Sequence, residues 1–127
     1  MLEVNPETIC FLIDKAREFH AKEAVVLPDA PDSPTEDWGQ QALADHEGDL
    51  TLQEFKATFA NLEPDQQQVV VALMWLGRGE FDVEEWEAAL EEASREWNDT
   101  TAEYLMAHPL LADYLSEGLD LLGYRCD

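Results

Sequence analysis

Carboxylates around a glycine turn are the first residues of this sequence whose types and spacing could do chemistry. Asp45 and Glu47 stand just before Gly48, and Glu54 follows within the next few residues. Carboxylate oxygens are the ligands that calcium and other hard cations prefer. Asp45, Glu47 and Glu54 are therefore the candidate metal ligands, and we expect them to attract divalent cations only weakly.

Two blocks of this region repeat one pattern. Residues 48–59 and 79–90 each read glycine, acid, large apolar residue, helix cap, two further residues, glutamate and an aromatic residue. The pattern resembles the second half of an EF-hand calcium loop, which implies bidentate ligands at Glu54 and Glu85. Leu43 departs from that family, because the earlier block needs an acidic first ligand there. The later block also lacks oxygen ligands at the corresponding positions, which hold Met74, Leu76 and Arg78. We expect two helix starts with capping boxes and no tight calcium site.

Other reactive side chains lack a recognisable catalytic setting. The sequence contains no HExxH, GxSxG, P-loop or GxGxxG pattern. His20 is a lone histidine on the apolar side of its predicted helix, where histidines usually serve as core residues. Cys10 and Cys126 lie near opposite ends without CxxC spacing, so we expect two free thiols. These features favour a non-enzymatic protein without a cofactor.

The central element of the chain is a predicted buried helix over about residues 64–77. Residues 69–76 carry no polar side chain, so a helix there must be surrounded by other helices. Pro64 suits the first helical position, and Gly77 suits a left-handed cap at the end.

A long amphipathic helix is predicted to follow the glycine turn. Asp82 and Glu85 have the spacing of a capping box, the apolar stripe runs from Trp86 to Tyr104, and the helix is expected to end near residue 108. Three indoles are expected to be buried in one core, those of Trp75, Trp86 and Trp97.

The remaining segments complete an all-α prediction for one domain over residues 1–127. Further helices are expected over residues 5–24, 34–48, 51–62 and 110–122. Asn5 should cap the first of these helices, and Gly123 should end the last. The prolines of residues 25–34 predict an extended strap. The fold class is therefore a single-domain bundle of about six helices around the helix at about 64–77.

The charge of the chain limits its partners. It carries 29 acidic residues against 7 lysines and arginines, a formal net charge of −22. Such a protein repels the phosphates of nucleic acids and anionic membrane surfaces, and it attracts basic proteins. The sequence contains neither a signal peptide pattern nor an apolar stretch that could span a bilayer, so we expect a cytoplasmic protein.

Three stretches together resemble a family of short, acidic, uncharacterised bacterial proteins. They are residues 9–20, the strap residues 32–34, and the segment LMWLGRG at residues 73–79. The resemblance implies a bacterial cytoplasmic protein but supplies no known activity. It directs attention to Trp75 and Arg78, and Phe11 lies off the apolar stripe of its helix. Phe11, Trp75 and Arg78 are therefore the candidate partner-binding residues.

Several functions fit these observations. The first is a non-enzymatic interaction or scaffold domain that binds a protein partner through an acidic helical surface, or forms a homo-oligomer through apolar side chains such as Phe11. The second is a DNA mimic that presents carboxylates to a nucleic-acid-binding protein. The third is a divalent-metal-binding protein that uses the incomplete loop at Asp45, Glu47 and Glu54. Adaptation to a salty environment would also account for the acidity.

Overall fold

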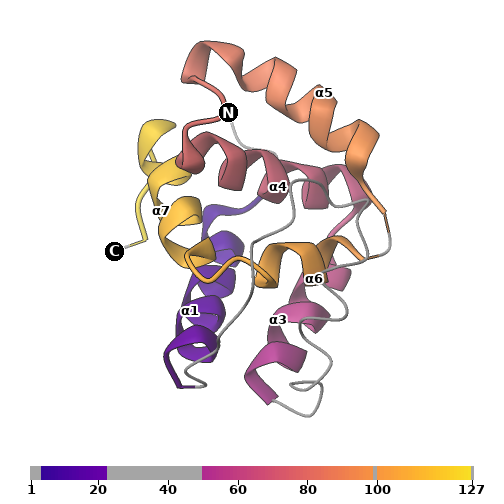
Figure 1. Ribbon diagram of the computed structural model, residues 1–127, viewed down its shortest axis with the longest axis vertical. Coiled ribbons are helices and arrows are strands. Elements are labelled where there is room, and N and C mark those ends of the chain that lie inside the picture. The colour runs from indigo at the N-terminus through magenta and orange to yellow at the C-terminus, as the bar shows by residue number, and fades with distance from the viewer. Residues whose placement is uncertain (1–3, 23–49, 99, 127) are drawn as a thin grey trace.

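The computed structural model describes residues 4–22, 50–98 and 100–126, which form an all-helical bundle (Figure 1). The elements are α1 (Pro6–Lys22), α3 (Leu50–Ala60), α4 (Pro64–Arg78), the 3-10 helix η2 (Val83–Glu85), α5 (Trp86–Glu96), α6 (Thr101–Met106) and α7 (Leu111–Leu121). No strand occurs in these ranges. The predicted all-α class is confirmed.

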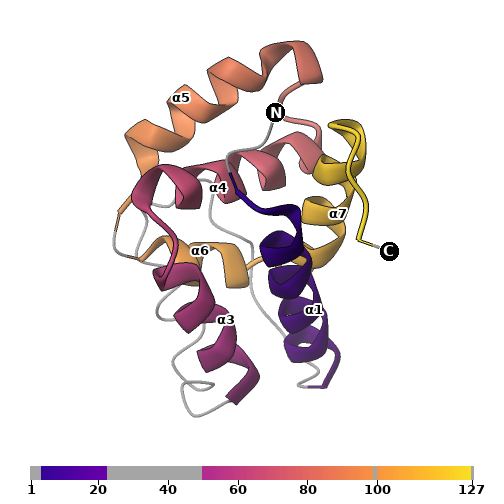
Figure 2. The ribbon, with the colours of Figure 1, turned by 180° about the vertical axis from the view of Figure 1, so that it is seen from behind.

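Helix α4 is the central element, as predicted. Every residue from 69 to 76 is buried, because a helix with no polar face needs neighbours on all sides. Helices α5 and α7 pack against α4, and α1 packs against α7 and α3. Figures 1 and 2 show α4 crossing the middle of the molecule, with α5 at one end and α1 and α3 toward the other. Pro64 occupies the first turn of α4, also as predicted.

The end of α4 differs from the prediction by two residues. Gly77 lies within the helix, and Gly79 takes the left-handed conformation with φ 88°. The N–H groups of Gly79 and Glu80 donate to the carbonyls of Leu76 and Trp75 at 3.1 and 3.0 Å. This is the double hydrogen bond of a Schellman cap, for which a glycine is favoured at the left-handed position.

Gly77 has a different role, which it shares with a glycine of α7. A Cβ atom at Gly77 would lie 1.8 Å from the carbonyl oxygen of Tyr114. A Cβ atom at Gly118 of α7 would lie 2.4 Å from the carbonyl oxygen of Leu73. The backbones of α4 and α7 therefore approach each other at two points where no side chain fits. Sequence reasoning assigned Gly77 to a cap because close helix contacts leave no local pattern.

The predicted long helix after the glycine turn is wrong in one respect, since it breaks into α5 and α6. The capping box of Asp82 and Glu85 is present, although it opens η2 before α5 begins. Helix α5 stops at Glu96. Thr101 Oγ1 then accepts from the Asn98 N–H at 3.1 Å and donates to the Asn98 carbonyl at 2.7 Å. These local hydrogen bonds compete with the helical ladder and end it there.

Of the three indoles expected in the core, only that of Trp75 is buried, with 4% of its surface exposed. Trp86 and Trp97 are half-buried. Helix α5 buries only Ala89 and Ala93. Because α5 rests on α4 through these small residues, the larger side chains remain partly at the surface.

The prediction of free thiols is wrong. Cys10 and Cys126 form a disulfide, with their Cα atoms 5.5 Å apart. The packing of α1 against α7 brings the two segments close, and Gly123, with φ 93°, turns the chain after α7. This proximity could not be predicted from the sequence, because the two cysteines are 116 residues apart. Structural disulfides are typical of oxidising compartments, so a cytoplasmic location stays a prediction.

Some predictions fall on residues outside the described ranges. The strap at 25–34, the helix at 34–48, and Asp45 and Glu47 all lie outside the described residues. The cap of α1 can be checked, because Asn5 Oδ1 accepts from the Glu7 N–H at 2.9 Å, as expected. In the described ranges, every helix is too short or too polar to cross a bilayer.

Candidate functional site

The predicted partner-binding residues fall in two places. Trp75 and Arg78 lie together near the end of α4. Phe11 lies on α1 with 40% of its surface exposed, and the Lys15 ammonium sits 5.3 Å from the centre of its ring. The structure therefore brings two of the three residues together and leaves Phe11 apart.

The predicted metal ligands can be followed only through Glu54. Its Oε1 atom lies 3.0 Å from Lys15 Nζ, and this contact raises the pKa of Lys15 above its usual value although burial opposes it. Glu54 thus has a lysine partner on α1. Within the described residues, no three histidine, cysteine or acidic side chains converge in a way that could hold a metal ion.

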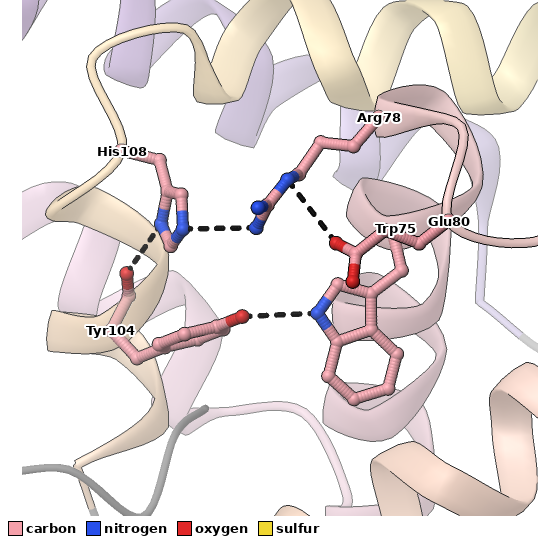
Figure 3. A network of polar contacts seen from close by, with 5 residues as sticks. All are labelled: Trp75, Arg78, Glu80, Tyr104 and His108. Carbon is pink, nitrogen blue, oxygen red and sulfur yellow. Dashed lines mark hydrogen bonds and ion pairs between the residues drawn. The ribbon is translucent and has the colours of Figure 1, made fainter. Parts of the chain in front are cut away.

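Arg78 is the centre of a polar network that joins α4 to the chain after α6 (Figure 3). Its Nε lies 3.2 Å from Glu80 Oε2, and its Nη1 lies 3.2 Å from His108 Nε2. The guanidinium carbon also lies 5.8 Å from the centre of the Tyr114 ring on α7. Arg78 therefore connects three segments, and its charge is directed at groups of its own chain.

The geometry fixes the tautomer of His108, which is only 2% exposed. An arginine can only donate, so His108 Nε2 accepts from Arg78. The other nitrogen, Nδ1, lies 2.9 Å from the Tyr104 carbonyl and donates its hydrogen there. Because the basic nitrogen of His108 faces Arg78, the ring positions the guanidinium.

Trp75 and Tyr104, both buried like His108, add a further hydrogen bond to the same network. Trp75 Nε1 donates to the Tyr104 hydroxyl oxygen at 3.0 Å. Burial raises the pKa of Tyr104 above its ordinary value, while the hydrogen bond from Trp75 opposes this shift. The phenol therefore stays neutral and serves as a hydrogen-bonding partner for the indole.

A small pocket of about 130 Å³ opens beside this network. It is lined by Trp75, Glu80, Phe81, Glu92 and Glu96. The rings of Trp75 and Phe81 lie 6.0 Å apart and are tilted by 34°, so they provide an apolar wall. The three glutamates come from the turn after α4 and from successive turns of α5. The pocket thus combines aromatic surface with carboxylates.

Two of these carboxylates also have arginine partners. Glu80 binds Arg78, and Glu92 binds Arg95 at Nη2. The side chains of Glu80 and Glu92 remain 45% and 40% exposed. Exposed ion pairs contribute little to stability and exchange readily, so both carboxylates remain accessible to an external cation.

This combination suits a positively charged group. Aromatic faces attract ammonium and guanidinium ions, and carboxylates accept their hydrogen bonds. A lysine or arginine side chain could place its aliphatic part against Trp75 and Phe81 and its charge among the glutamates. The Arg78 network supports this arrangement because it holds Glu80 beside the pocket.

Sequence reasoning did not find Glu80, Phe81, Glu92 or Glu96 as site residues. One signal was available, since Glu92 and Glu96 are four residues apart on one helix, where like charges repel. Such a pair marks a place where an opposite charge would be favourable. In so acidic a sequence, however, this signal is hard to distinguish from the background.

The described residues therefore form an all-helical fold with a small pocket lined by aromatic rings and carboxylates. Residues 52–124 match the model of a family described as a protein of unknown function, DUF3775. The match covers more than half of the chain, which therefore belongs to the DUF3775 family. It includes every residue of the Arg78 network and of the pocket, whereas α1 with Phe11 precedes it. Searches of the curated proteins and of the solved structures gave no match.

Proposed function

We propose that this protein is a non-enzymatic interaction domain that binds a basic protein segment through the surface formed by residues 80–96. The observation that carries the proposal is the pocket in which Trp75 and Phe81 face Glu80, Glu92 and Glu96. A pocket of this size holds the end of one lysine or arginine side chain, which suits recognition of a peptide or protein.

The charge of the surrounding surface supports this function. Residues 80–96 include one basic residue, Arg95, among the acids Glu80, Asp82, Glu84, Glu85, Glu87, Glu91, Glu92 and Glu96. Helix α5 rests on the rest of the molecule through α4, at one end of the bundle (Figure 1). A surface with one sign of charge steers an oppositely charged partner and raises the rate of association.

Arg78 and Arg95 would compete with a partner for the carboxylates of the pocket. A basic side chain entering the pocket competes with Arg78 for Glu80 and with Arg95 for Glu92. Binding therefore exchanges one ion pair for another, and the gain comes from contact with the aromatic wall. A basic region of a nucleic-acid-binding protein is one partner of this chemistry, which is the DNA-mimic form of the proposal.

A titration of a fluorescently labelled lysine-rich peptide tests this function. The double variant Glu92→Gln, Glu96→Gln removes two charges of the pocket. The control Asp14→Asn, Glu18→Gln removes two exposed charges of α1 at the same spacing. We expect the pocket variant to bind about tenfold more weakly, because it loses charge-assisted hydrogen bonds, and the control to bind within about twofold of the wild type. Equal losses in the two variants would show nonspecific attraction and refute the proposal.

Phe11 is proposed as a contact between two copies of the chain, because it is an exposed aromatic side chain on a helix distant from the pocket. It would support pairing of two copies of the chain. Sedimentation velocity of the wild type and of Phe11→Ser tests this role. A wild-type dimer that becomes a monomer in the variant would support it, and a monomer in both would remove it.

A further inference from the structure

The disulfide between Cys10 and Cys126 is covered unequally at its two ends. Cys126 is exposed and belongs to the segment that follows α7, drawn in yellow in Figure 2. Cys10 is half-buried on α1 and packs against the hydrophobic core. Exposed disulfides are the ones that exchange readily with external thiols. The two sulfur atoms of this bond therefore differ in their access to a thiol in solution.

Two surface pockets border the disulfide. The larger, of about 450 Å³, borders Cys126 but not Cys10. The smaller, of about 290 Å³, borders both cysteines. A thiolate attacks one sulfur of a disulfide from the side away from the sulfur that leaves. At Cys126 that side faces away from Cys10, and the larger pocket offers room next to Cys126 alone. The core packing of Cys10 leaves less room for the corresponding approach to its sulfur.

The larger pocket is balanced in charge, unlike the chain as a whole. Its charged lining residues are two arginines and two acids, namely Arg17, Arg125, Glu117 and Asp120. The whole chain has 29 acidic residues against 7 basic ones and therefore repels anions. A small thiol that carries negative charge meets no net repulsion from this lining. The volume of the pocket lies within the range of sites for small organic molecules.

We propose that Cys126 is a thiol–disulfide exchange site, at which a small thiol such as glutathione enters the larger pocket and forms a mixed disulfide. The sulfur of the incoming thiolate bonds to Cys126 Sγ, and the bond between the two Sγ atoms breaks. The electron pair of that bond leaves with Cys10, whose thiolate takes up the proton that the incoming thiol has lost. The incoming sulfur is oxidised and the sulfur of Cys10 is reduced. The site is independent of the proposed protein-binding function, because it shares no lining residue with the pocket beside Trp75.

Two substitutions by tryptophan compare the two pockets as routes to the disulfide. Glu117→Trp places a large ring in the larger pocket, and Glu7→Trp places the same ring in the smaller one, each in place of an exposed glutamate. The folded proteins are incubated with glutathione and quenched with acid, and alkylation with mass spectrometry measures the fraction that keeps the disulfide. We expect Glu117→Trp to slow the reaction at least about fivefold, and Glu7→Trp to leave the rate within about twofold of the wild type. A slowing by Glu117→Trp that does not exceed the slowing by Glu7→Trp would overturn the proposal.

Two further measurements decide the proposal even if Glu117→Trp fails to fold. The wild-type rate should be unchanged in low, non-denaturing urea, because exchange takes place on the folded protein. A rate that rises in proportion to the unfolded fraction would refute this. The single variants Cys10→Ser and Cys126→Ser, treated with oxidised glutathione, report the remaining sulfur separately. We expect the Cys10→Ser protein, which keeps Cys126, to form its mixed disulfide at least about tenfold faster. Equal rates in the two variants would contradict the assignment of Cys126 as the accessible sulfur.

Discussion

Trp75 belongs both to the hydrophobic core and to the candidate site. Its ring is almost fully buried, its Nε1 is bonded to Tyr104, and its face lines the acidic pocket with Phe81. Most residues of a binding pocket can be changed without affecting the fold. Trp75 is an exception, because the same ring fills the core and forms the apolar wall.

Replacing Trp75 by alanine should lower the free energy of unfolding by about 3–5 kcal/mol, since it leaves a large cavity and removes the hydrogen bond to the Tyr104 hydroxyl. Trp86→Ala is the matched control, because that indole is half-exposed and should cost about 1–2 kcal/mol. Urea unfolding followed by circular dichroism measures both. Similar losses in the two variants would mean that Trp75 is not the core residue described above.

His20 is the second residue whose environment makes a prediction. Its Nε2 lies 3.0 Å from the Met106 carbonyl, which can only accept, so Nε2 carries the hydrogen and Nδ1 is the basic nitrogen. Nδ1 is buried and accepts no hydrogen bond from the described part of the chain. Burial lowers the pKa of His20 below its usual value of 6.5, although backbone carbonyls oppose the shift.

The lowered pKa gives a pH dependence of defined sign. Below about pH 6.5 the unfolded chain takes up a proton that the folded His20 resists, so acid favours unfolding. The free energy of unfolding should therefore fall as the pH decreases through that value. His20→Gln keeps an N–H donor for Met106 but cannot titrate, so its stability should fall less over the same range. Parallel pH profiles from urea titrations of the two proteins would contradict this assignment.

At the level of the helices, the contact of α4 with α7 depends on the two glycines that lack room for a Cβ atom. Gly77→Ala should lower the free energy of unfolding by about 1–3 kcal/mol or more, because the new methyl group would overlap the Tyr114 carbonyl. Gly79→Ala is the contrasting variant, since nothing lies within 4 Å of its Cβ position and only its positive φ is unfavourable. We expect it to cost about 1 kcal/mol. Thermal melts of both proteins measure the difference, and a milder effect at Gly77 than at Gly79 would refute the close contact.

The helices show which features a sequence can predict. The caps at Asn5 and Gly123 and the box at Asp82 and Glu85 were predicted correctly, because each depends on residues within one turn. The cap assigned to Gly77 was wrong, since the role of this glycine depends on α7, a helix that follows much later in the chain. The break before α6 arises from the local hydrogen bonds between Asn98 and Thr101. It was not predicted, because the apolar spacing continues through these residues as it would in one helix.

At the level of the whole molecule, the disulfide between Cys10 and Cys126 connects α1 to the segment after α7. The double variant Cys10→Ser, Cys126→Ser should lose about 2–4 kcal/mol of unfolding free energy, as is typical when a long loop is released. A reducing agent should produce the same loss in the wild type and no change in the double variant. Unchanged stability of the wild type under reduction would show that the bond contributes nothing to the fold.

The candidate site was only partly predictable because it is a property of the whole molecule. Trp75 and Arg78 could be selected from the sequence, the first for its place in the buried run and the second as a rare basic residue. Glu80 approaches Glu92 and Glu96 only because η2 folds α5 back over α4. The same holds for Cys10 and Cys126, which meet through the packing of α1 against α7.

We propose above all that a basic segment binds to residues 80–96 and inserts a side chain beside Trp75. An NMR titration of the wild-type protein with a lysine-rich peptide at moderate salt tests it most directly, because backbone amide and indole signals report the location of binding. We predict saturable shifts concentrated at residues 80–96 and at the Trp75 indole N–H, and binding that weakens as sodium chloride is raised. Shifts spread evenly over the acidic residues of α1, α5 and α7, with no change at Trp75, would contradict it.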